Sequence, residues 1–243
     1  MEDEEIFREI EKEYGELKGG FVEDSNFYKR ILNEIKVYVE SILRNECMPI
    51  CIREKNHVIL ELIRIYLGFD FGPINSTNVY YGAAVHKVIK EHLLNNIEKL
   101  YNALDDVFIF YFDKFPSSYG FVYPNFQCIF INESIYMKSG FFNGYKKLFK
   151  NNGYEKIATV FHELSHIALN TKDFEYDVYN CTVKLTTSDQ KCRNADNWGY
   201  LLTLIYLLIQ MDTDKFLKLY DLDRKHFDFF DFLSSYRSGS DRY

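Results

Sequence analysis

The sequence lacks an excess of basic residues, a signal-peptide pattern and a long apolar run, and each absence bears on the class of protein to expect. Its 29 Lys and Arg residues are outnumbered by 36 Asp and Glu residues, which gives a formal net charge of −7. General binding to nucleic acid or to anionic membranes needs clustered basic side chains, so we expect neither. The most apolar stretch, residues 201–211, is shorter than the roughly 20 residues that span a bilayer, so we expect no membrane span.

The N-terminal segment is acidic and has no signal-peptide pattern, because it lacks both a basic region and an apolar run. We therefore expect a cytoplasmic protein, or one that is secreted or translocated by a specialised system.

Cysteine is scarce, and its pattern does not indicate a disulfide framework. The chain has five cysteines, an odd number, and enough apolar residues to fold without covalent cross-links. We expect reduced thiols, and a disulfide between Cys181 and Cys192 across a short connection is the open alternative. Cys47 and Cys51 form a C-x3-C pair without a second pair, which is weak support for a structural zinc site.

Apolar and aromatic side chains are abundant, at 47% and 18% of the residues, and indicate a globular fold. Two aromatic and β-branched runs of strand length, 107–112 and 120–132, are separated by a turn-forming segment and predict a small antiparallel sheet. Elsewhere apolar residues recur every three or four positions, which is the spacing of amphipathic helices. We expect a mainly helical α+β protein with helices at 24–45, 83–104, 154–169, 177–187, 195–211 and 215–235, and a further apolar run at 57–69 ends in a loop.

The predicted helix at 154–169 contains two histidines and a glutamate in the sequence HELSH. His162 and His166 are four residues apart, so on a helix their imidazoles project from the same face and can bind one zinc ion. Glu163 lies alongside, where its carboxylate can take a proton from a water that zinc has made more acidic. These residue types suit peptide hydrolysis. The alternative is an ordinary helix that carries the pattern by chance.

A catalytic zinc site generally has three protein ligands and an open position, so a third ligand is expected nearby. Asn170 lies where a left-handed C-terminal helix cap would fall and would turn the chain. Asp173 comes seven residues after His166, far enough for its carboxylate to return to the metal, and Tyr176 follows about one helical turn later. Asp173 is also a candidate N-cap for a helix over 174–187.

These residues resemble the aspzincin metallopeptidases, the group of deuterolysin and lysine-specific metalloendopeptidase. Their pattern is H-E-x-x-H followed by G-T-x-D-x-x-Y-G. The second half reads NTKDFEYD here, which keeps Thr171, Asp173 and Tyr176 and replaces the two glycines with Asn170 and Asp177.

Two further stretches are similar to the same family. The sequence NADNWGY at 194–200 resembles the family's N-A-D-N-Y-E-Y, and GFVYPNFQCIFIN at 120–132 resembles a strand segment around Y-P-N. The resemblance extends over about residues 65–208.

The resemblance implies a zincin-like catalytic domain with an H-E-x-x-H active-site helix and one catalytic Zn²⁺ ion. His162, His166 and Asp173 would be the zinc ligands. Glu163 would be the general base and acid, and Tyr176 would donate its hydroxyl group to the developing oxyanion.

Asp196 would help to bind substrate, because the lysine-specific members use the Asp and Glu of N-A-D-N-Y-E to recognise the lysine after the scissile bond. Gly199 stands where that Glu would be. A lysine pocket here would have lost half of its charge complementarity. Asp196 is also a candidate cap for the predicted helix at 195–211.

We therefore expect a zinc metalloendopeptidase that acts on a protein or peptide substrate, with delivery as an effector or toxin as one setting. The alternatives are a zinc amidase acting on peptidoglycan peptides and a zinc-binding interaction module without turnover. For the domains we expect an N-terminal helical extension at 1–60, the metallopeptidase domain at 61–210, and a C-terminal aromatic helical extension at 211–243 packed on it. The sequence gives no oligomeric state.

Overall fold

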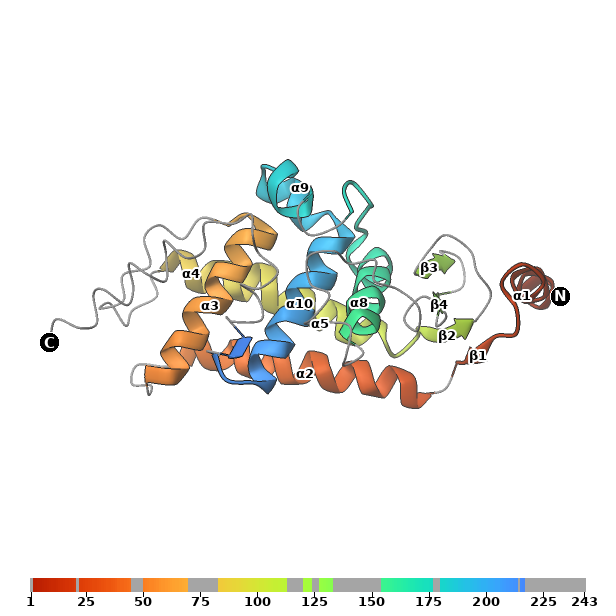
Figure 1. Cartoon of the computed structure of the whole chain (residues 1–243), viewed down its shortest axis with the longest axis horizontal. Coiled ribbons are helices and arrows are strands. Elements are labelled where there is room, and N and C mark those ends of the chain that lie inside the picture. The colour runs from red at the N-terminus through yellow and green to blue at the C-terminus, as the bar shows by residue number, and fades with distance from the viewer. Residues whose placement is uncertain are drawn as a thin grey trace, which may run out of the picture.

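The computed structural model describes residues 2–20, 22–44, 50–69, 83–112, 120–123, 127–132, 154–176, 180–213 and 215–216. Most of these residues form helices, and the remainder include four short strands (Figure 1). The elements are α1 (Glu2–Tyr14), β1 (Lys18–Gly19), α2 (Val22–Arg44), α3 (Ile50–Leu67), α4 (Ala83–Val88), η1 (Ile89–Leu94), α5 (Asn95–Ala103), β2 (Phe108–Phe112), β3 (Gly120–Tyr123), β4 (Cys128–Asn132), α8 (Tyr154–Leu169), η2 (Asn180–Lys184), α9 (Ser188–Cys192) and α10 (Ala195–Gln210).

The helices expected from apolar spacing are largely confirmed. The predictions at 24–45, 154–169 and 195–211 correspond to α2, α8 and α10, and the one at 83–104 corresponds to α4, η1 and α5, in which η1 is a π-helical segment. The apolar run at 57–69 lies largely within α3, which begins at Ile50 and ends at Leu67. In these ranges no helix is both long and apolar enough to cross a membrane. The predicted helix at 215–235 lies almost wholly outside the described residues.

The helix predicted at 177–187 is confirmed only in part, because residues 185–187 are not helical and 177–179 lie outside the described residues. Residues 180–184 form the π-helical η2, and a separate helix, α9, begins at Ser188. Thr187 starts α9 with a capping box, in which its side chain accepts a hydrogen bond from the backbone N–H of Gln190 while the Gln190 side chain accepts from the backbone N–H of Thr187. This local hydrogen bonding at Thr187 favours an extended residue where a continuous helix was expected.

The four strands form a mixed sheet in the order β1-β2-β4-β3, which corrects the prediction of an antiparallel one. The outer pairs, β1 with β2 and β3 with β4, are antiparallel, but the central pair of β2 and β4 is parallel. The reason is the chain path, because β3 lies between β2 and β4 in sequence and passes to the far side of β4. Apolar spacing along a strand sets which face is buried and does not identify its neighbour.

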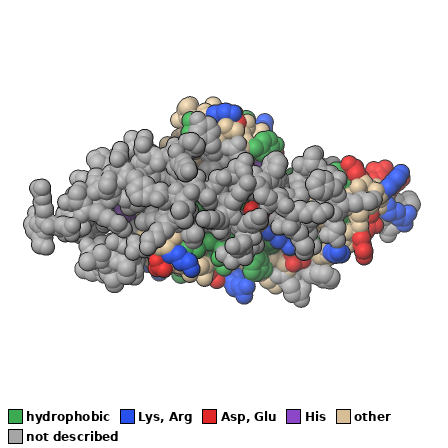
Figure 2. All heavy atoms as spheres, viewed as in Figure 1, with side chains coloured by type: hydrophobic (Ala, Val, Ile, Leu, Met, Phe, Trp, Pro, Cys, Tyr) green, Lys and Arg blue, Asp and Glu red, His purple; other side chains and the backbone are tan. Residues whose placement is uncertain are grey.

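The two faces of the sheet pack against different helices. Ile109, Tyr111, Ile129 and Ile131 point into the main core, whereas alternate residues on the same strands point the other way. That second face packs against α1 in a cluster containing Ile6, Phe7, Ile10, Tyr14, Phe110, Phe112, Phe121 and Phe130. The outward side of α1 carries charged side chains of both signs, at one end of the molecule (Figure 2).

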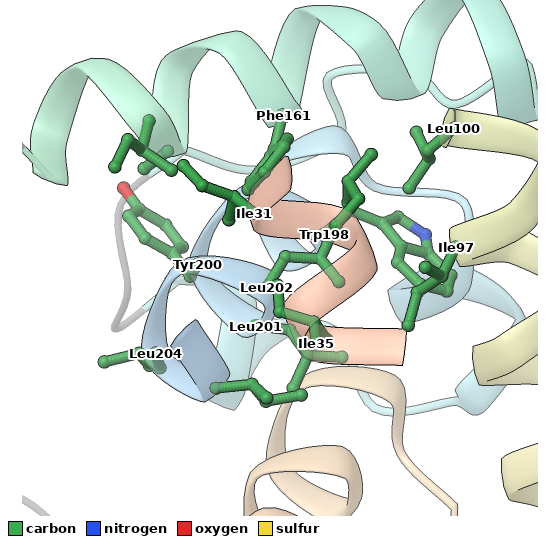
Figure 3. Packing of buried hydrophobic residues seen from close by; sticks show 14 of the residues in the cluster. Ile31, Ile35, Ile97, Leu100, Phe161, Trp198, Tyr200, Leu201, Leu202 and Leu204 are labelled. Carbon is green, nitrogen blue, oxygen red and sulfur yellow. The ribbon is translucent and has the colours of Figure 1, made fainter. Parts of the chain in front are cut away.

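The main core is centred on α10, whose side chains are apolar on nearly every face. Figure 3 shows Trp198 of α10 among buried residues of the same cluster that come from α2, α5 and α8. Trp198 is fully buried, and its indole N–H donates a hydrogen bond of 2.8 Å to the carbonyl oxygen of Cys192. A helix that is apolar all round is expected at the centre of a protein, where other helices surround it.

Replacing Trp198 with Phe should lower the free energy of unfolding by about 2–4 kcal/mol, because it leaves a cavity and an unpaired carbonyl group at Cys192. Urea unfolding followed by circular dichroism measures the change. Val37→Ala is the control, because Val37 is 58% exposed and its loss should change the stability by no more than about 0.5 kcal/mol. Equal effects of the two substitutions would contradict this account of the core.

Candidate metal centre

The end of α8 sets the first half of the site. His162 and His166 lie on its last two turns, and the helix stops at Leu169. Asn170 has a φ of +53°, which confirms the left-handed residue expected there. The turn is closed by Ser165, whose hydroxyl group lies 2.7 Å from that of Thr171. The chain therefore folds back along its own helix immediately after the second histidine.

Residues 171–176, here called the strap, run beside the start of α10. The backbone N–H of Lys172 donates to the carbonyl oxygen of Arg193, and that of Ala195 donates to the carbonyl oxygen of Lys172, at 2.8 and 3.1 Å. Asn194 is fully buried and fixes the following residues with its side chain. Its amide oxygen accepts from the backbone N–H groups of Phe174 and Glu175, and its amide nitrogen donates to the carbonyl oxygen of Glu175.

Asp173 is carried by the strap to the two histidines. The Nε2 atoms of His162 and His166 lie 3.2 Å apart, and Oδ1 of Asp173 lies 3.1 Å from the first and 3.2 Å from the second. In tetrahedral zinc sites with ligand distances of about 2.0–2.1 Å, neighbouring donor atoms are roughly 3.3 Å apart. The three atoms therefore have the spacing of one face of a zinc coordination tetrahedron, and they form a candidate metal-binding group.

The hydrogen bonds on the far side of each imidazole determine which nitrogen faces the site. Nδ1 of His162 lies 2.6 Å from Oδ1 of Asp196, and Nδ1 of His166 lies 3.0 Å from the carbonyl oxygen of Thr171. A carboxylate and a carbonyl only accept hydrogen bonds, so each Nδ1 carries a proton. In the neutral rings both Nε2 lone pairs then point toward Asp173, and only a positive charge among the three atoms stabilises that arrangement.

The pKa shifts of the site residues also indicate that the site favours a positive charge. Burial opposes the charged form of His162, but hydrogen bonds to Asp173 and Asp196 outweigh it and raise the pKa of His162 well above its ordinary value. Burial likewise opposes ionisation of Asp173, yet its contacts with the two histidines hold its pKa well below the ordinary range. The surroundings therefore favour a cation at this point and keep the Asp173 carboxylate charged.

Glu163 lies beside the three donor atoms without being one of them. Its Oε1 atom is 4.0 Å from Nε2 of His162, and the residue is only 5% exposed. Burial raises the pKa of Glu163 above its ordinary value, while the two histidines act in the opposite direction. Gly120 at the start of β3 leaves room for this side chain, because a Cβ atom there would be 3.1 Å from Oε1 of Glu163.

Tyr176 ends the strap and is the most exposed of the predicted site residues, at 60%. Its partly buried hydroxyl group and the nearby Asp173 carboxylate raise the pKa of Tyr176 to about 12. The phenol therefore keeps its proton throughout the neutral range and can donate a hydrogen bond beside the metal-binding group.

Asp196 lies in the first turn of α10, behind His162. The N-cap of that helix is Asn194, which answers the question of whether Asp196 is the cap. No α-helix begins at Asp173 either, because residues 170–176 are irregular apart from a bridge between Lys172 and Asn194. The substrate-binding role expected of Asp196 stays a prediction, as do the roles expected of the other site residues.

Sequence reasoning missed the buried amides that hold the strap. Besides its contacts with the strap, Asn194 donates to Oδ1 of Asn197, which in turn donates to the carbonyl oxygens of Tyr66 and Cys181. Two asparagines within four residues at the start of an otherwise apolar helix are the signal that could have identified them. Among the described residues Cys128, Cys181 and Cys192 form no disulfide, which agrees with the expected reduced thiols and leaves the alternative of a Cys181–Cys192 disulfide unsupported.

Replacing Asn194 with Ala should weaken zinc binding by about 10–100-fold, because the strap loses the bonds that hold the residues next to Asp173. Competition with a chromophoric chelator measures the dissociation constant. Asn95→Ala is the matched control, since Asn95 is exposed on α5 and its loss should leave the constant unchanged. Unchanged zinc affinity in Asn194→Ala would mean that the strap keeps its position without this side chain.

Comparison with known proteins adds a family to this geometry. The model of the aspzincin family, described as lysine-specific metallo-endopeptidase, matches residues 81–202. Comparisons of the chain with curated proteins and with solved structures gave no match. The family match includes the whole of α8, the strap and the first half of α10, and it covers half of the sequence. The chain therefore belongs to the aspzincin family of zinc-dependent metallo-endopeptidases.

Proposed function

We propose that this chain is a zinc-dependent metalloendopeptidase in which Glu163 acts as general base. The observation that carries the proposal is the convergence of two Nε2 atoms and one carboxylate oxygen, each 3.1–3.2 Å from the others, beside a buried glutamate. His162, His166 and Asp173 would hold one zinc ion. When bound there, zinc supplies a Lewis acid that polarises the peptide carbonyl group and lowers the pKa of water.

Glu163 would move the protons of the reaction. Its carboxylate takes a proton from the attacking water and later passes it to the nitrogen of the leaving amine, so that it returns to its starting state. A general base works best when its pKa is close to the working pH, and burial moves the pKa of Glu163 in that direction. A glutamate that contributed only to the structure would have no need to lie unbound beside three metal-binding atoms.

Tyr176 would stabilise the oxyanion that forms as water adds to the carbonyl carbon. A phenol with a pKa of about 12 stays protonated at neutral pH and can donate to that oxygen. The Asp173 carboxylate that raises this pKa belongs to the metal-binding group, so the Tyr176 hydroxyl group is close to that group. Delivery as an effector, the zinc amidase and the inactive binding module stay predictions from the sequence, because no contact among the described residues favours any of them.

Glu163→Gln should lower kcat by about 10²–10⁴-fold and leave one equivalent of zinc bound, since the amide cannot take up the proton. The test incubates both proteins with a protein mixture and reads new termini by mass spectrometry, while metal analysis reports the zinc content. Glu175→Gln is the matched control, because that carboxylate contacts Lys184 Nζ at 3.2 Å instead of the metal-binding group. Hydrolysis by Glu163→Gln at the rate of the parent would contradict the role of Glu163 as general base.

Tyr176→Phe should lower kcat by about 10²-fold with little change in KM or in zinc content, because the donor acts on the transition state alone. Kinetics on a peptide identified in the previous experiment measure both constants. Tyr101→Phe, on α5, should behave as the parent. An increase in KM without a fall in kcat would assign Tyr176 to substrate binding instead.

A further inference from the structure

The two helices that frame the site, α8 and α10, pack so closely that their backbones are in contact at Gly199. A Cβ atom at Gly199 of α10 would lie 2.6 Å from the carbonyl oxygen of Ala158 and 3.3 Å from Cβ of His162, both on α8. No real side chain tolerates the first distance, so any residue larger than glycine would push the helices apart. Gly199 therefore sets the separation of α8 and α10 beside the metal-binding group.

This contact also determines what Asp196 can reach. Asp196 and Gly199 are three residues apart on one face of α10, and Ala158 and His162 are four apart on the facing side of α8. Gly199 lies against Ala158, and one turn away Asp196 lies against His162, with Oδ1 at 2.6 Å from Nδ1. The hydrogen bond is thus available because the helices are close.

The Asp196 carboxylate is enclosed on its other side as well. Its Oδ2 atom lies 4.0 Å from the thiol of the fully buried Cys181, and its side chain is only 15% exposed. A carboxylate that binds a cationic substrate side chain must present an oxygen to the open face of the site. Here Oδ1 lies against the His162 imidazole and Oδ2 lies near the buried Cys181 thiol.

We propose that Asp196 is a positioning residue for His162, not a substrate-binding residue, and that Gly199 makes this role possible. Asp196 keeps the proton of His162 on Nδ1 and the ring oriented, so that Nε2 is available as a metal ligand. Cleavage then does not depend on a lysine after the scissile bond. This inference rests on the proposed function for its consequences in catalysis, but not for its effect on zinc affinity.

The decisive measurement is the zinc dissociation constant of variants in the absence of substrate. Asp196→Ala should weaken zinc binding by about 10–100-fold. Asp196→Asn should weaken it less, because the amide oxygen can still accept the Nδ1 proton. Asp189→Asn is the matched control, since Asp189 is 78% exposed on α9 and its replacement should leave the constant unchanged. Unchanged affinity in Asp196→Ala would overturn the proposal.

The role of Gly199 is tested by combining substitutions. Gly199→Ala should weaken zinc binding although Asp196 is still present, because the added methyl group separates the helices. In the double variant, which also carries Asp196→Ala, the loss of zinc affinity should equal the larger of the two single losses. The losses should not add, because both changes remove the same hydrogen bond. Fully additive losses would overturn the link between the two residues. If Gly199→Ala does not fold, as judged by circular dichroism, the Asp196 series still decides the positioning role.

A substrate series separates this inference from the proposed function. The parent and Asp196→Asn would be assayed at saturating zinc on two peptides that differ only in Lys or Leu after the cleaved bond. A positioning residue changes kcat by the same factor for both, whereas a substrate-binding residue raises KM for the lysine peptide alone. If the parent protein binds zinc but cleaves nothing, the proposed peptidase activity is refuted. The zinc dissociation constants of the variants would still decide the role of Asp196. A parent that binds no zinc would overturn both.

Discussion

The close packing of α8 against α10 is the constraint on which the rest of the site depends. α8 carries both histidines and Glu163, and the start of α10 carries Asp196 and Asn194. If the helices were further apart by the width of a side chain, His162 would lose its carboxylate partner, and the strap that Asn194 holds would move away from the histidines. One glycine at the contact and a core of fully buried apolar side chains on both helices maintain that distance.

The same packing places acidic groups where they would be costly without a cation. Glu163 and His162 are nearly inaccessible to solvent, and the carboxylates of Asp173 and Asp196 lie on either side of the His162 ring. Buried charges of one sign destabilise a fold unless an opposite charge neutralises them. The histidines respond by favouring their protonated forms, and a divalent ion among the three donor atoms would supply the charge more effectively. Occupation of the site by such an ion would therefore stabilise the fold.

Features of the site that depend on residues close together in the sequence could be predicted, whereas features that depend on residues far apart could not. His162, Glu163 and His166 share one helix, and the turn at Asn170 depends on that residue's own conformational preference, so spacing alone brought these features together. Asn194 was missed because its partners lie about 20 residues away in the strap. The parallel pairing of β2 with β4 was missed for a related reason, since periodicity says nothing of the neighbouring strand. Gly199 was interpreted as the loss of a glutamate, whereas its role in the fold is the helix contact, which no pattern within α10 could indicate.

Segments outside the family match also support the site. The C-terminal end of α3 leaves carbonyl groups without partners in their own helix, as every helix end does. Side chains that flank the start of α10 satisfy them, because Lys191 Nζ donates to the carbonyl oxygen of Ile65 and the Asn197 amide to that of Tyr66. Asn197 in turn accepts from Asn194, which holds the strap. The position of Asp173 therefore depends on a chain of hydrogen bonds that ends on α3, and the apolar side chains of α2 belong to the same core. A site built from two helices and a strap needs this third support, because the strap has too few apolar side chains to fix its own position.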